Sequence, residues 1–247
     1  MSKIRRILKN SLSLLSVAIH YNRRSKVLYL HDVHDDKQYA VEDKSMPIKT
    51  FLDVMQSVKE SGFSIVPVIE KKENQVMICF DDGYRGIWDC REYLADNGIF
   101  PTIFVATSLI GKDNYLTREE IEILADMGFS IQSHTVSHLP LTSLDKSKLK
   151  SEMLESKQTL EQIVHKDVRQ VCLPWGYYNE EVLEVAANYY DLVFLSTPGT
   201  YWDEKDTGLI HRVLCQESSP ATIKLDLLGG QEIFYRRNKK QHYHKTV

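Results

Sequence analysis

The sequence predicts a single α/β domain built on a mostly parallel β-sheet, either closed into a barrel or left open. Its 247 residues suit one large domain or at most two small ones. After residue 25, short β-rich runs alternate with stretches of helical periodicity, the order typical of β-α-β units. The composition, with 43% hydrophobic and 26% charged residues, provides a sizeable core and excludes a disordered, collagenous or coiled-coil chain.

Eight short apolar runs are the expected strands. They are Lys26–His31, Phe63–Val68, Val76–Phe80, Thr102–Ala106, Phe129–Gln132, Val168–Leu173, Asp191–Leu195 and Leu209–Leu214. The helices expected between them are Ile48–Glu60, Tyr84–Asn97, Arg118–Met127, Lys146–His165 and Glu180–Tyr189. Thr117 and Glu120 form a capping-box pattern before the third of these helices, and Gly98 and Gly128 act as helix stops. No repeat or linker interrupts the pattern, so we expect one domain over residues 26–234.

The segment before this domain, residues 1–25, is expected to form a basic amphipathic helix. The first 31 residues contain seven Lys or Arg residues and no acid, whereas the whole chain has a net charge of −3. The tail at 235–247 is basic again. The helix is expected to pack on its own domain, with contact to a partner protein or an anionic membrane surface as the alternative. Its apolar residues recur at helical spacing: Ile4, Leu8, Leu12, Leu15 and Ile19.

Composition also argues against several other classes of protein. No run of about 18 apolar residues predicts a membrane span, and no signal-peptide cleavage pattern follows the basic start. The body is acidic and has no basic stripe, which argues against nucleic-acid binding. The four cysteines lack metal-site or disulfide spacing, so free thiols in a reducing compartment are expected. We therefore expect a cytoplasmic protein, with peripheral contact at the inner membrane face as the helix's alternative role.

Chemically active residues follow directly after four of the expected strands. They are His31 after VLYL, Asp81 and Asp82 after VMICF, His134 after FSIQS and Trp175 in the turn after VCL. Because the carboxyl ends of parallel strands meet at one rim, these side chains are expected to lie together although they are distant in sequence.

Two histidines in this set suit a metal site. His134 and His138 are four residues apart, a spacing that presents both rings on one side of a helix or tight turn. With one strand-end aspartate they give two imidazoles and one carboxylate, which suits a catalytic zinc or another divalent ion. The second aspartate is then available as a base. The alternatives are an ordinary Asp-Gly turn and two unrelated histidines.

Three motifs in this order resemble the polysaccharide deacetylase family, the NodB-like carbohydrate esterases. They are FDDGY (80–84), SHTVSH (133–138) and LPWGYYN (173–179), and the resemblance extends from about residue 26 to 215. It implies a distorted (β/α) barrel of about seven strands. It also implies that Asp81 is the general base and that Asp82, His134 and His138 bind one divalent metal ion, with zinc as the expected ion.

The chain departs from this family at the third motif, where the family usually has Arg-x-Pro-aromatic-Gly. Cys172 occupies the arginine position, and that arginine normally orients the base. Arg212 is the candidate replacement, with a surface arginine as the alternative. The resemblance further implies that the backbone N–H of Trp175 helps to hold the oxyanion and that its ring walls the acetyl pocket, with an ordinary core tryptophan as the alternative.

The general acid has two candidates. LIH (209–211) matches the family's C-terminal leucine-x-histidine motif, but LYLHDV (28–33) resembles the amino-terminal segment of the circularly permuted branch, which includes deacetylases of biofilm poly-N-acetylglucosamine. We favour His31, because strand alternation places His211 on the face opposite Arg212. The other histidines are expected to be solvated: His20, His34, His165, His242 and His244.

These residues together predict a metal-dependent hydrolase that removes N-acetyl groups from an N-acetylated sugar or polysaccharide and releases acetate. Tyr84, Tyr177 and Tyr178 are expected to line the sugar cleft. Two other functions stay open, an amidase of a small non-sugar substrate and a non-catalytic carbohydrate-binding relic of the fold.

Overall fold

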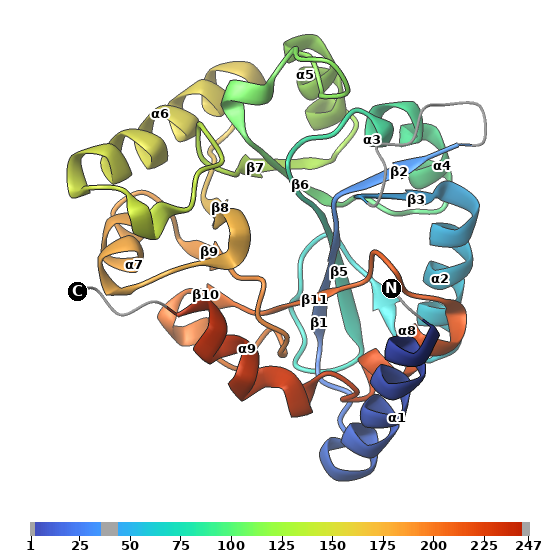
Figure 1. The fold of residues 1–247 in the computed structure, drawn as a ribbon. Coiled ribbons are helices and arrows are strands. Elements are labelled where there is room, and N and C mark those ends of the chain that lie inside the picture. The colour runs from blue at the N-terminus through green and yellow to red at the C-terminus, as the bar shows by residue number, and fades with distance from the viewer. Residues whose placement is uncertain (1–2, 36–43, 244–247) are drawn as a thin grey trace.

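A mostly parallel sheet surrounded by helices forms the body of the protein, which confirms the predicted α/β class (Figure 1). The computed structural model describes residues 3–35 and 44–243, and side chains are described for all of these except 3–10 and 236–238. All strand pairs in the main sheet are parallel.

The main sheet runs in the order β10-β9-β8-β7-β6-β5-β1-β11, with β4 paired to β5. Its strands in chain order are β1 (Lys26–Leu30), β4 (Ser64–Ile65), β5 (Gln75–Phe80), β6 (Thr102–Val105), β7 (Ser130–Ser133), β8 (Gln170–Cys172), β9 (Leu192–Phe194), β10 (Leu209–Ile210) and β11 (Arg212–Leu214). The two ends of this path, β10 and β11, are separated in the chain by His211 alone. The hydrogen-bonded path is therefore open there, but the chain itself brings its two edges together.

The single strand predicted at Leu209–Leu214 is wrong, because the segment contains two strands. Ile210 pairs with Phe194 of β9, whereas Arg212 pairs with Val27 of β1. The chain changes neighbours at His211, so one continuous strand cannot serve both edges. This corner places Arg212 beside β1, from where its side chain reaches Asp81 at the carboxyl end of β5.

Four of the predicted helices lie where the periodicity placed them, to within about two residues. They are α2 (Ile48–Glu60), α5 (Arg118–Asp126), α6 (Lys146–Val164) and α7 (Glu180–Ala187). The stretch at 84–97 contains two short helices, α3 (Gly86–Asp89) and α4 (Arg91–Asp96), instead of one. Gly86 packs so closely on the neighbouring backbone that a Cβ there would lie 1.9 Å from the Val33 carbonyl oxygen.

Two strands and two α-helices of the described residues were not predicted. The strands β2 (Asp32–His34) and β3 (Ser45–Pro47) form a separate two-stranded sheet, and the helices α8 (Pro220–Leu227) and α9 (Tyr235–His242) complete the C-terminal part. The two strands have only three residues each, and α9 reads YRRNKKQH, without apolar periodicity. These two strands and α9 carry no pattern that the sequence can reveal.

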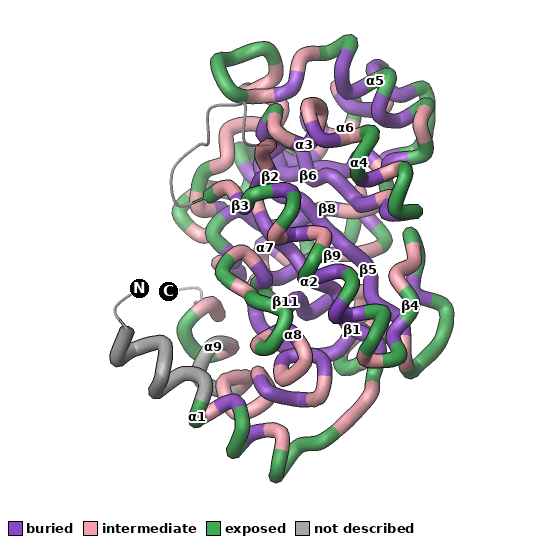
Figure 2. The backbone as a smooth tube through the Cα atoms, turned by 90° about the vertical axis from the view of Figure 1, so that its right-hand side faces the viewer, coloured by how far each residue is buried: buried purple, intermediate pink, exposed green. Residues whose placement is uncertain are grey.

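The central strands are buried on both faces, which places the core on either side of the sheet (Figure 2). In β5, Val76, Ile78 and Phe80 pack in the cluster that contacts the helices, while Met77 and Cys79 pack in a smaller cluster on the inner face. This double burial explains why the strands read as continuous apolar runs. The polar residues that follow them lie at one end of this core.

The N-terminal helix α1 (Lys3–His20) contacts the body differently from the prediction. Its buried residues are Ser13 and Ser16, whereas Leu15 and Ile19 of the predicted apolar stripe are 50% and 62% exposed. Ser16 is buried because its hydroxyl donates a hydrogen bond to the Gly229 carbonyl at 2.6 Å. Among the residues that the structure describes, no helix is long and apolar enough to cross a membrane.

Candidate active site

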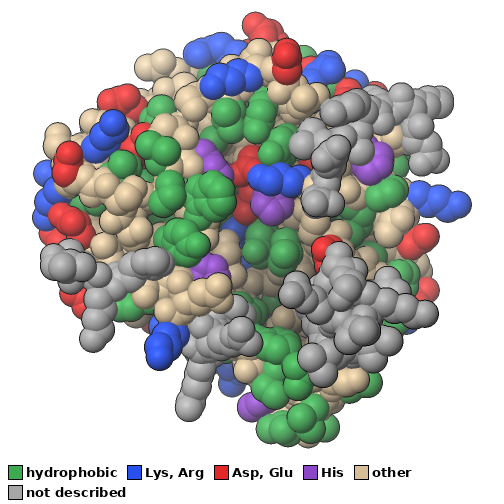
Figure 3. All heavy atoms as spheres, in the orientation of Figure 1, with side chains coloured by type: hydrophobic (Ala, Val, Ile, Leu, Met, Phe, Trp, Pro, Cys, Tyr) green, Lys and Arg blue, Asp and Glu red, His purple; other side chains and the backbone are tan. Residues whose placement is uncertain are grey.

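A cavity of about 600 Å³ opens where the strands end, at the centre of the face shown in Figure 3. Carboxylates, histidines and a lysine gather inside it and hydrophobic side chains flank it. The seven residues singled out from the sequence all line it: His31, Asp81, Asp82, His134, His138, Trp175 and Arg212. Segments separated by up to 181 positions in the chain are thus brought to one site.

Asp82, His134 and His138 form a compact cluster in this cavity. Asp82 Oδ1 lies 3.2 Å from His134 Nε2 and 3.0 Å from His138 Nε2. The ligand atoms of the three residues lie within 4.8 Å of one another. Burial alone would raise the pKa of Asp82, but the hydrogen bonds from the two histidines hold it well below its usual value. The carboxylate is therefore ionised.

The orientation of His134 fits a metal ligand. Its Nδ1 lies 2.7 Å from the carbonyl oxygen of Cys172, which can only accept a hydrogen bond. Nδ1 therefore carries a proton, and Nε2, the ring atom that faces Asp82, is the one that would bind a metal ion when the ring is neutral. A carboxylate oxygen facing two imidazole nitrogens at about hydrogen-bond distance is a donor set that a divalent cation satisfies.

The structure offers a second, overlapping set of metal-type ligands, Asp81, His134 and Cys172. Arg212 occupies this position already: its Nη2 lies 3.0 Å from Cys172 Sγ and 2.9 Å from Asp81 Oδ2. A cation bound there would face the guanidinium charge at contact distance, and burial raises the pKa of the Cys172 thiol, which favours its neutral form. The charges therefore favour the set that contains Asp82.

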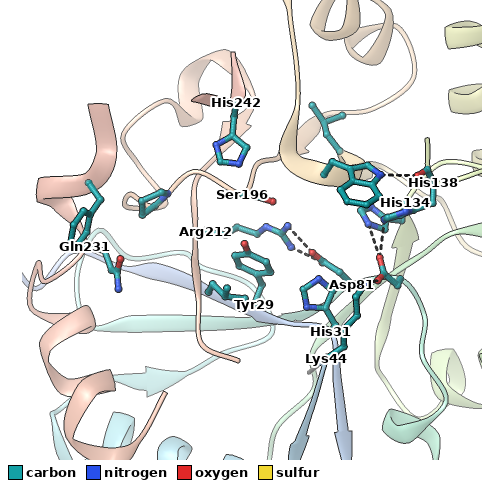
Figure 4. A pocket seen from close by; sticks show the side chains of 16 residues that line it. Tyr29, His31, Lys44, Asp81, His134, His138, Ser196, Arg212, Gln231 and His242 are labelled. Atoms are coloured by element: carbon teal, nitrogen blue, oxygen red, sulfur yellow. Dashed lines mark hydrogen bonds and ion pairs between the residues drawn. The ribbon is translucent and has the colours of Figure 1, made fainter. Parts of the chain in front are cut away.

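Asp81 is held by a buried, bidentate ion pair with Arg212. Arg212 Nη1 donates to Oδ1 at 2.7 Å and Nη2 to Oδ2, and neither side chain is more than 5% exposed. Burial alone would raise the pKa of Asp81, but the Arg212 guanidinium outweighs it and holds the pKa below its usual value. Figure 4 shows Asp81 between Arg212 on one side and His134 and His138 on the other. Asp81 is thus an ionised carboxylate next to the metal-type cluster.

Arg212 is itself fixed from several sides. Its Nε donates to the Leu195 carbonyl at 3.0 Å, and the guanidinium carbon lies 4.1 Å from the centre of the Tyr29 ring. Cys172, at the position where the resemblance expected arginine, is small enough to leave room for this side chain. The alternative of a surface arginine is therefore wrong.

The two acid candidates lie in different places. His31 lines the cavity, and the Gln216 side-chain oxygen accepts from its backbone N–H at 2.9 Å and lies 3.1 Å from its Nδ1. His211 is fully buried outside the cavity lining, with its Nε2 2.9 Å from Glu204 Oε2. The sheet corner places His211 and Arg212 on opposite sides, as strand alternation predicts.

The turn that carries the two histidines is anchored by Glu152 of α6. One carboxylate oxygen accepts from the backbone N–H groups of Val136 and Ser137, both at 2.9 Å, and the other accepts from the Ser137 hydroxyl at 2.5 Å. This turn needs support, because Thr135 and His138 have φ values of 65° and 55°, in the sparsely populated left-handed region. Sequence reasoning missed Glu152, which lies in an ordinary amphipathic helix.

Trp175 lies at the mouth of the cavity and not in the core. Its side chain is 60% exposed, and its indole Nε1 donates to the carbonyl of His138 at 3.1 Å. The following Gly176 has a φ of 70°, and a Cβ there would lie 2.7 Å from Ser196 Cβ. The positive φ and the lack of space for a Cβ explain why glycine occupies position 176. This close packing on Ser196 also fixes the turn that carries Trp175.

Several aromatic and histidine predictions are wrong. None of Tyr84, Tyr177 and Tyr178 lines the cavity, because Tyr84 stacks on Tyr115 at 4.7 Å and Tyr178 packs on Tyr243 in the core. The prediction that His242 is simply solvated is also wrong, since it lines the cavity. His244 lies outside the described residues.

Other lining residues had no signal in the sequence. Lys44 Nζ lies 3.3 Å from Asp82 Oδ2, and the C-terminal segment contributes Gln231 and Phe234 to the cavity lining. These residues belong to short or irregular segments, so only the folded chain shows that they reach the site.

The segment that contains most of these site residues matches a known protein family. Residues 69–190 match the family model described as polysaccharide deacetylase. This segment of the chain belongs to the polysaccharide deacetylase family. The matched segment of this polysaccharide deacetylase homologue contains Asp81, Asp82, His134 and His138, whereas Arg212 lies outside it, as does His31.

Relatives extend the similarity in sequence and in structure. YxkH of Bacillus subtilis, assigned to the polysaccharide deacetylases, is 33% identical over 157 residues, which cover 63% of this chain and 56% of that protein. The similarity thus spans little more than half of the relative's length.

Solved structures share the fold at low sequence identity. BC0361, a polysaccharide deacetylase from Bacillus cereus, has a TM-score of 0.72 at 21% identity, covering 83% of this chain and 69% of its own. The deacetylase PplD from Streptococcus pyogenes, solved with acetate, has a TM-score of 0.72 at 21% identity and coverages of 83% and 98%. IcaB from Ammonifex degensii has a TM-score of 0.71 at 16% identity, covering 85% of this chain and 98% of its own.

Proposed function

We propose that this protein removes N-acetyl groups from an N-acetylated sugar or polysaccharide and releases acetate, using one divalent metal ion. The observation that carries the proposal is the position of Asp81. This carboxylate is held ionised by buried Arg212 and lies directly beside the Asp82, His134 and His138 cluster in one open cavity. Membership of the polysaccharide deacetylase family supports a hydrolase acting on a glycan.

Asp82, His134 and His138 are the residues that would hold the ion. Two imidazoles and one carboxylate are a ligand set that suits zinc and leaves coordination positions open. When bound, such an ion polarises a carbonyl oxygen and lowers the pKa of a coordinated water. The protein contributes the orientation of His134, through the Cys172 carbonyl, and of the histidine turn, through Glu152.

Asp81 acts as the general base in this proposal. It accepts a proton from the water that attacks the acetyl carbonyl carbon, and Arg212 is the positioning residue that keeps its two oxygens fixed. The negative charge that develops on the carbonyl oxygen needs a nearby donor, and we assign part of this role to the backbone N–H of Trp175, which lines the cavity.

His31 acts as the general acid. The Gln216 side-chain oxygen accepts from its Nδ1–H, so Nε2 of the protonated ring holds the proton that is delivered. As the carbon–nitrogen bond of the tetrahedral species breaks, this proton goes to the leaving nitrogen, and acetate and a free amino sugar result. Because His31 follows β1, before the β5 strand that carries Asp81, the arrangement supports placement in the circularly permuted branch.

The non-catalytic alternative loses its main support. It rested on Cys172 in place of the motif arginine, but Arg212 supplies a guanidinium to the same aspartate from another strand. No contact in the described cavity favours a small non-sugar substrate.

Acetate release from N-acetylglucosamine oligomers tests the proposal. The purified protein is assayed as prepared, after removal of metal with a chelator, and after addition of zinc, cobalt or nickel. Release that disappears with the chelator and returns with metal is expected, and Asp82→Asn should not recover with metal. Glycan binding without acetate release under every metal condition would instead show the non-catalytic relic.

A further inference from the structure

The outer face of α1 presents apolar side chains to solvent. Leu14, Leu15 and Ile19 are 57%, 50% and 62% exposed, and Tyr21 just after the helix is 62% exposed. In Figure 3, hydrophobic side chains gather over the lower end of α1. Leu15 and Ile19, four residues apart, are neighbours on the helix surface, and Leu14 extends the exposed apolar area, whereas isolated exposed apolar residues are ordinary.

This orientation of α1 is fixed by its opposite, small-residue face. The Ser16 hydroxyl donates to the Gly229 carbonyl at 2.6 Å and accepts from the Ile233 N–H at 3.1 Å. Gly229 packs on the end of the helix so closely that a Cβ there would lie 2.4 Å from the His20 carbonyl oxygen. The helix therefore cannot roll its leucines toward the body without breaking these contacts.

The sequences of α1 and α9 are strongly basic, and Glu232, in the segment that contacts α1, pairs with Lys26. Helix α1 contains four Lys or Arg residues in its sequence and α9 another four, and neither contains Asp or Glu. The rest of the chain is acidic enough to make the net charge −3. The two helices lie on the same side of the molecule in Figure 1, and α1 contacts the segment Glu232–Phe234, which leads directly into α9. Of the α9 cations, Lys239 pairs with Glu204.

We propose that α1 docks this protein on an anionic lipid surface, with Leu14, Leu15 and Ile19 inserted between headgroups. An exposed apolar face on a helix whose sequence has four Lys or Arg residues and no acid matches the chemistry of such a surface, where apolar burial and electrostatic attraction act together. The same segment that contacts α1 ends at Phe234, which lines the cavity. Docking thus holds one wall of the cavity close to the lipid, and it does not depend on the deacetylase reaction.

Vesicle cosedimentation tests the docking face. The full chain is mixed with vesicles of phosphatidylcholine alone or of an equimolar mixture with phosphatidylglycerol, at about 0.1 M salt, where the Debye length is about 10 Å. We expect binding to the mixed vesicles and at least about tenfold weaker binding to phosphatidylcholine alone. The triple variant Leu14→Ser, Leu15→Ser, Ile19→Ser should lose at least about tenfold of the binding to mixed vesicles.

The matched control changes three apolar residues that are similarly exposed elsewhere. Val68, Tyr93 and Ile123 are 59%, 48% and 46% exposed, and their combined change to Ser should leave binding unchanged. Thermal unfolding checks that both triple variants remain folded. Equal binding to the two vesicle types, or wild-type binding by the α1 variant, would overturn the proposal. So would a dimer in light scattering that the α1 variant converts to monomer, because a second copy would then cover the face.

Discussion

The two walls of the cavity are built in different ways. Asp82, His134 and His138 come from the ends of β5 and β7, inside the segment that matches the family model, and local turns orient them. The opposite wall takes His31 from the end of β1 and Arg212 from β11, both outside that segment. The metal-type wall is thus encoded in short motifs, whereas the second wall is assembled only when the sheet brings β1 and β11 beside β5.

Asp81 lies where the two walls meet. It follows β5 in the same motif as Asp82, yet its charged partner is Arg212, 131 positions away in the chain. Under the proposed function the two walls have separate tasks: the first would hold the metal ion, and the second would set how Asp81 and the leaving group exchange protons. Variants of each wall should separate metal content from turnover.

The largest effect is expected for His134→Ala, in the first wall. Loss of this buried ligand should remove the ion and the activity together, because the remaining set has one imidazole and one carboxylate. Metal content by atomic emission and acetate release measured on the same sample check the prediction. Stoichiometric metal in this variant would show that Asp82, His134 and His138 are not the ligand set.

A smaller effect is expected for His31→Ala, in the second wall. Metal content should stay at the wild-type level, and turnover of an N-acetyl amide should fall by about 10²–10⁴-fold, the usual contribution of a general acid. An activated aryl acetate should be hydrolysed at nearly the wild-type rate, since its leaving group needs little protonation.

His211→Ala is the control for this pair, because His211 lies outside the cavity lining. It should leave the ratio of amide to ester turnover unchanged. A fall in that ratio for His211→Ala, with no fall for His31→Ala, would reverse the assignment of the acid.

The smallest effect is expected for Glu152→Gln, because Glu152 supports the turn that carries the two histidines of the first wall. An amide keeps one acceptor oxygen but cannot hold both backbone N–H groups and the Ser137 hydroxyl as the carboxylate does. Metal affinity, measured by titration calorimetry on metal-free protein, should fall by about 10–100-fold, as for other groups that orient metal ligands. Glu155→Gln, an exposed residue on the same helix, is the matched control and should not change the affinity.

The fold could be predicted where burial leaves a strong pattern. The buried strands and the helices α2, α5, α6 and α7 read clearly, because apolar periodicity and caps such as Thr117 mark them. The corner at His211 could not be predicted, since nothing in LIHRVL marks the point where a strand changes neighbours. The short strands β2 and β3 are stabilised by pairing with each other, which no local pattern records.

The candidate site shows the same division. The positions of the metal-type residues follow from strand ends and the spacing of two histidines, and Arg212 follows from a missing arginine in a motif. Glu152, Gln216 and Phe234 could not be found, because their contacts depend on tertiary packing between segments distant in the chain. The predicted tyrosines failed for the opposite reason, since aromatic residues after a motif pack in the body as readily as in a cleft.

The variant Asp81→Asn tests the central claim most directly. Acetate release, metal content and thermal unfolding are measured on one preparation of this variant and of the wild type. The substituted amide keeps the size of the side chain and one oxygen for Arg212, and it leaves Asp82, His134 and His138 intact, so the metal should be retained. Turnover should fall by about 10²–10⁴-fold. Near-wild-type acetate release by a folded, metal-loaded Asp81→Asn protein would contradict the account of Asp81 as the base on which the two walls act.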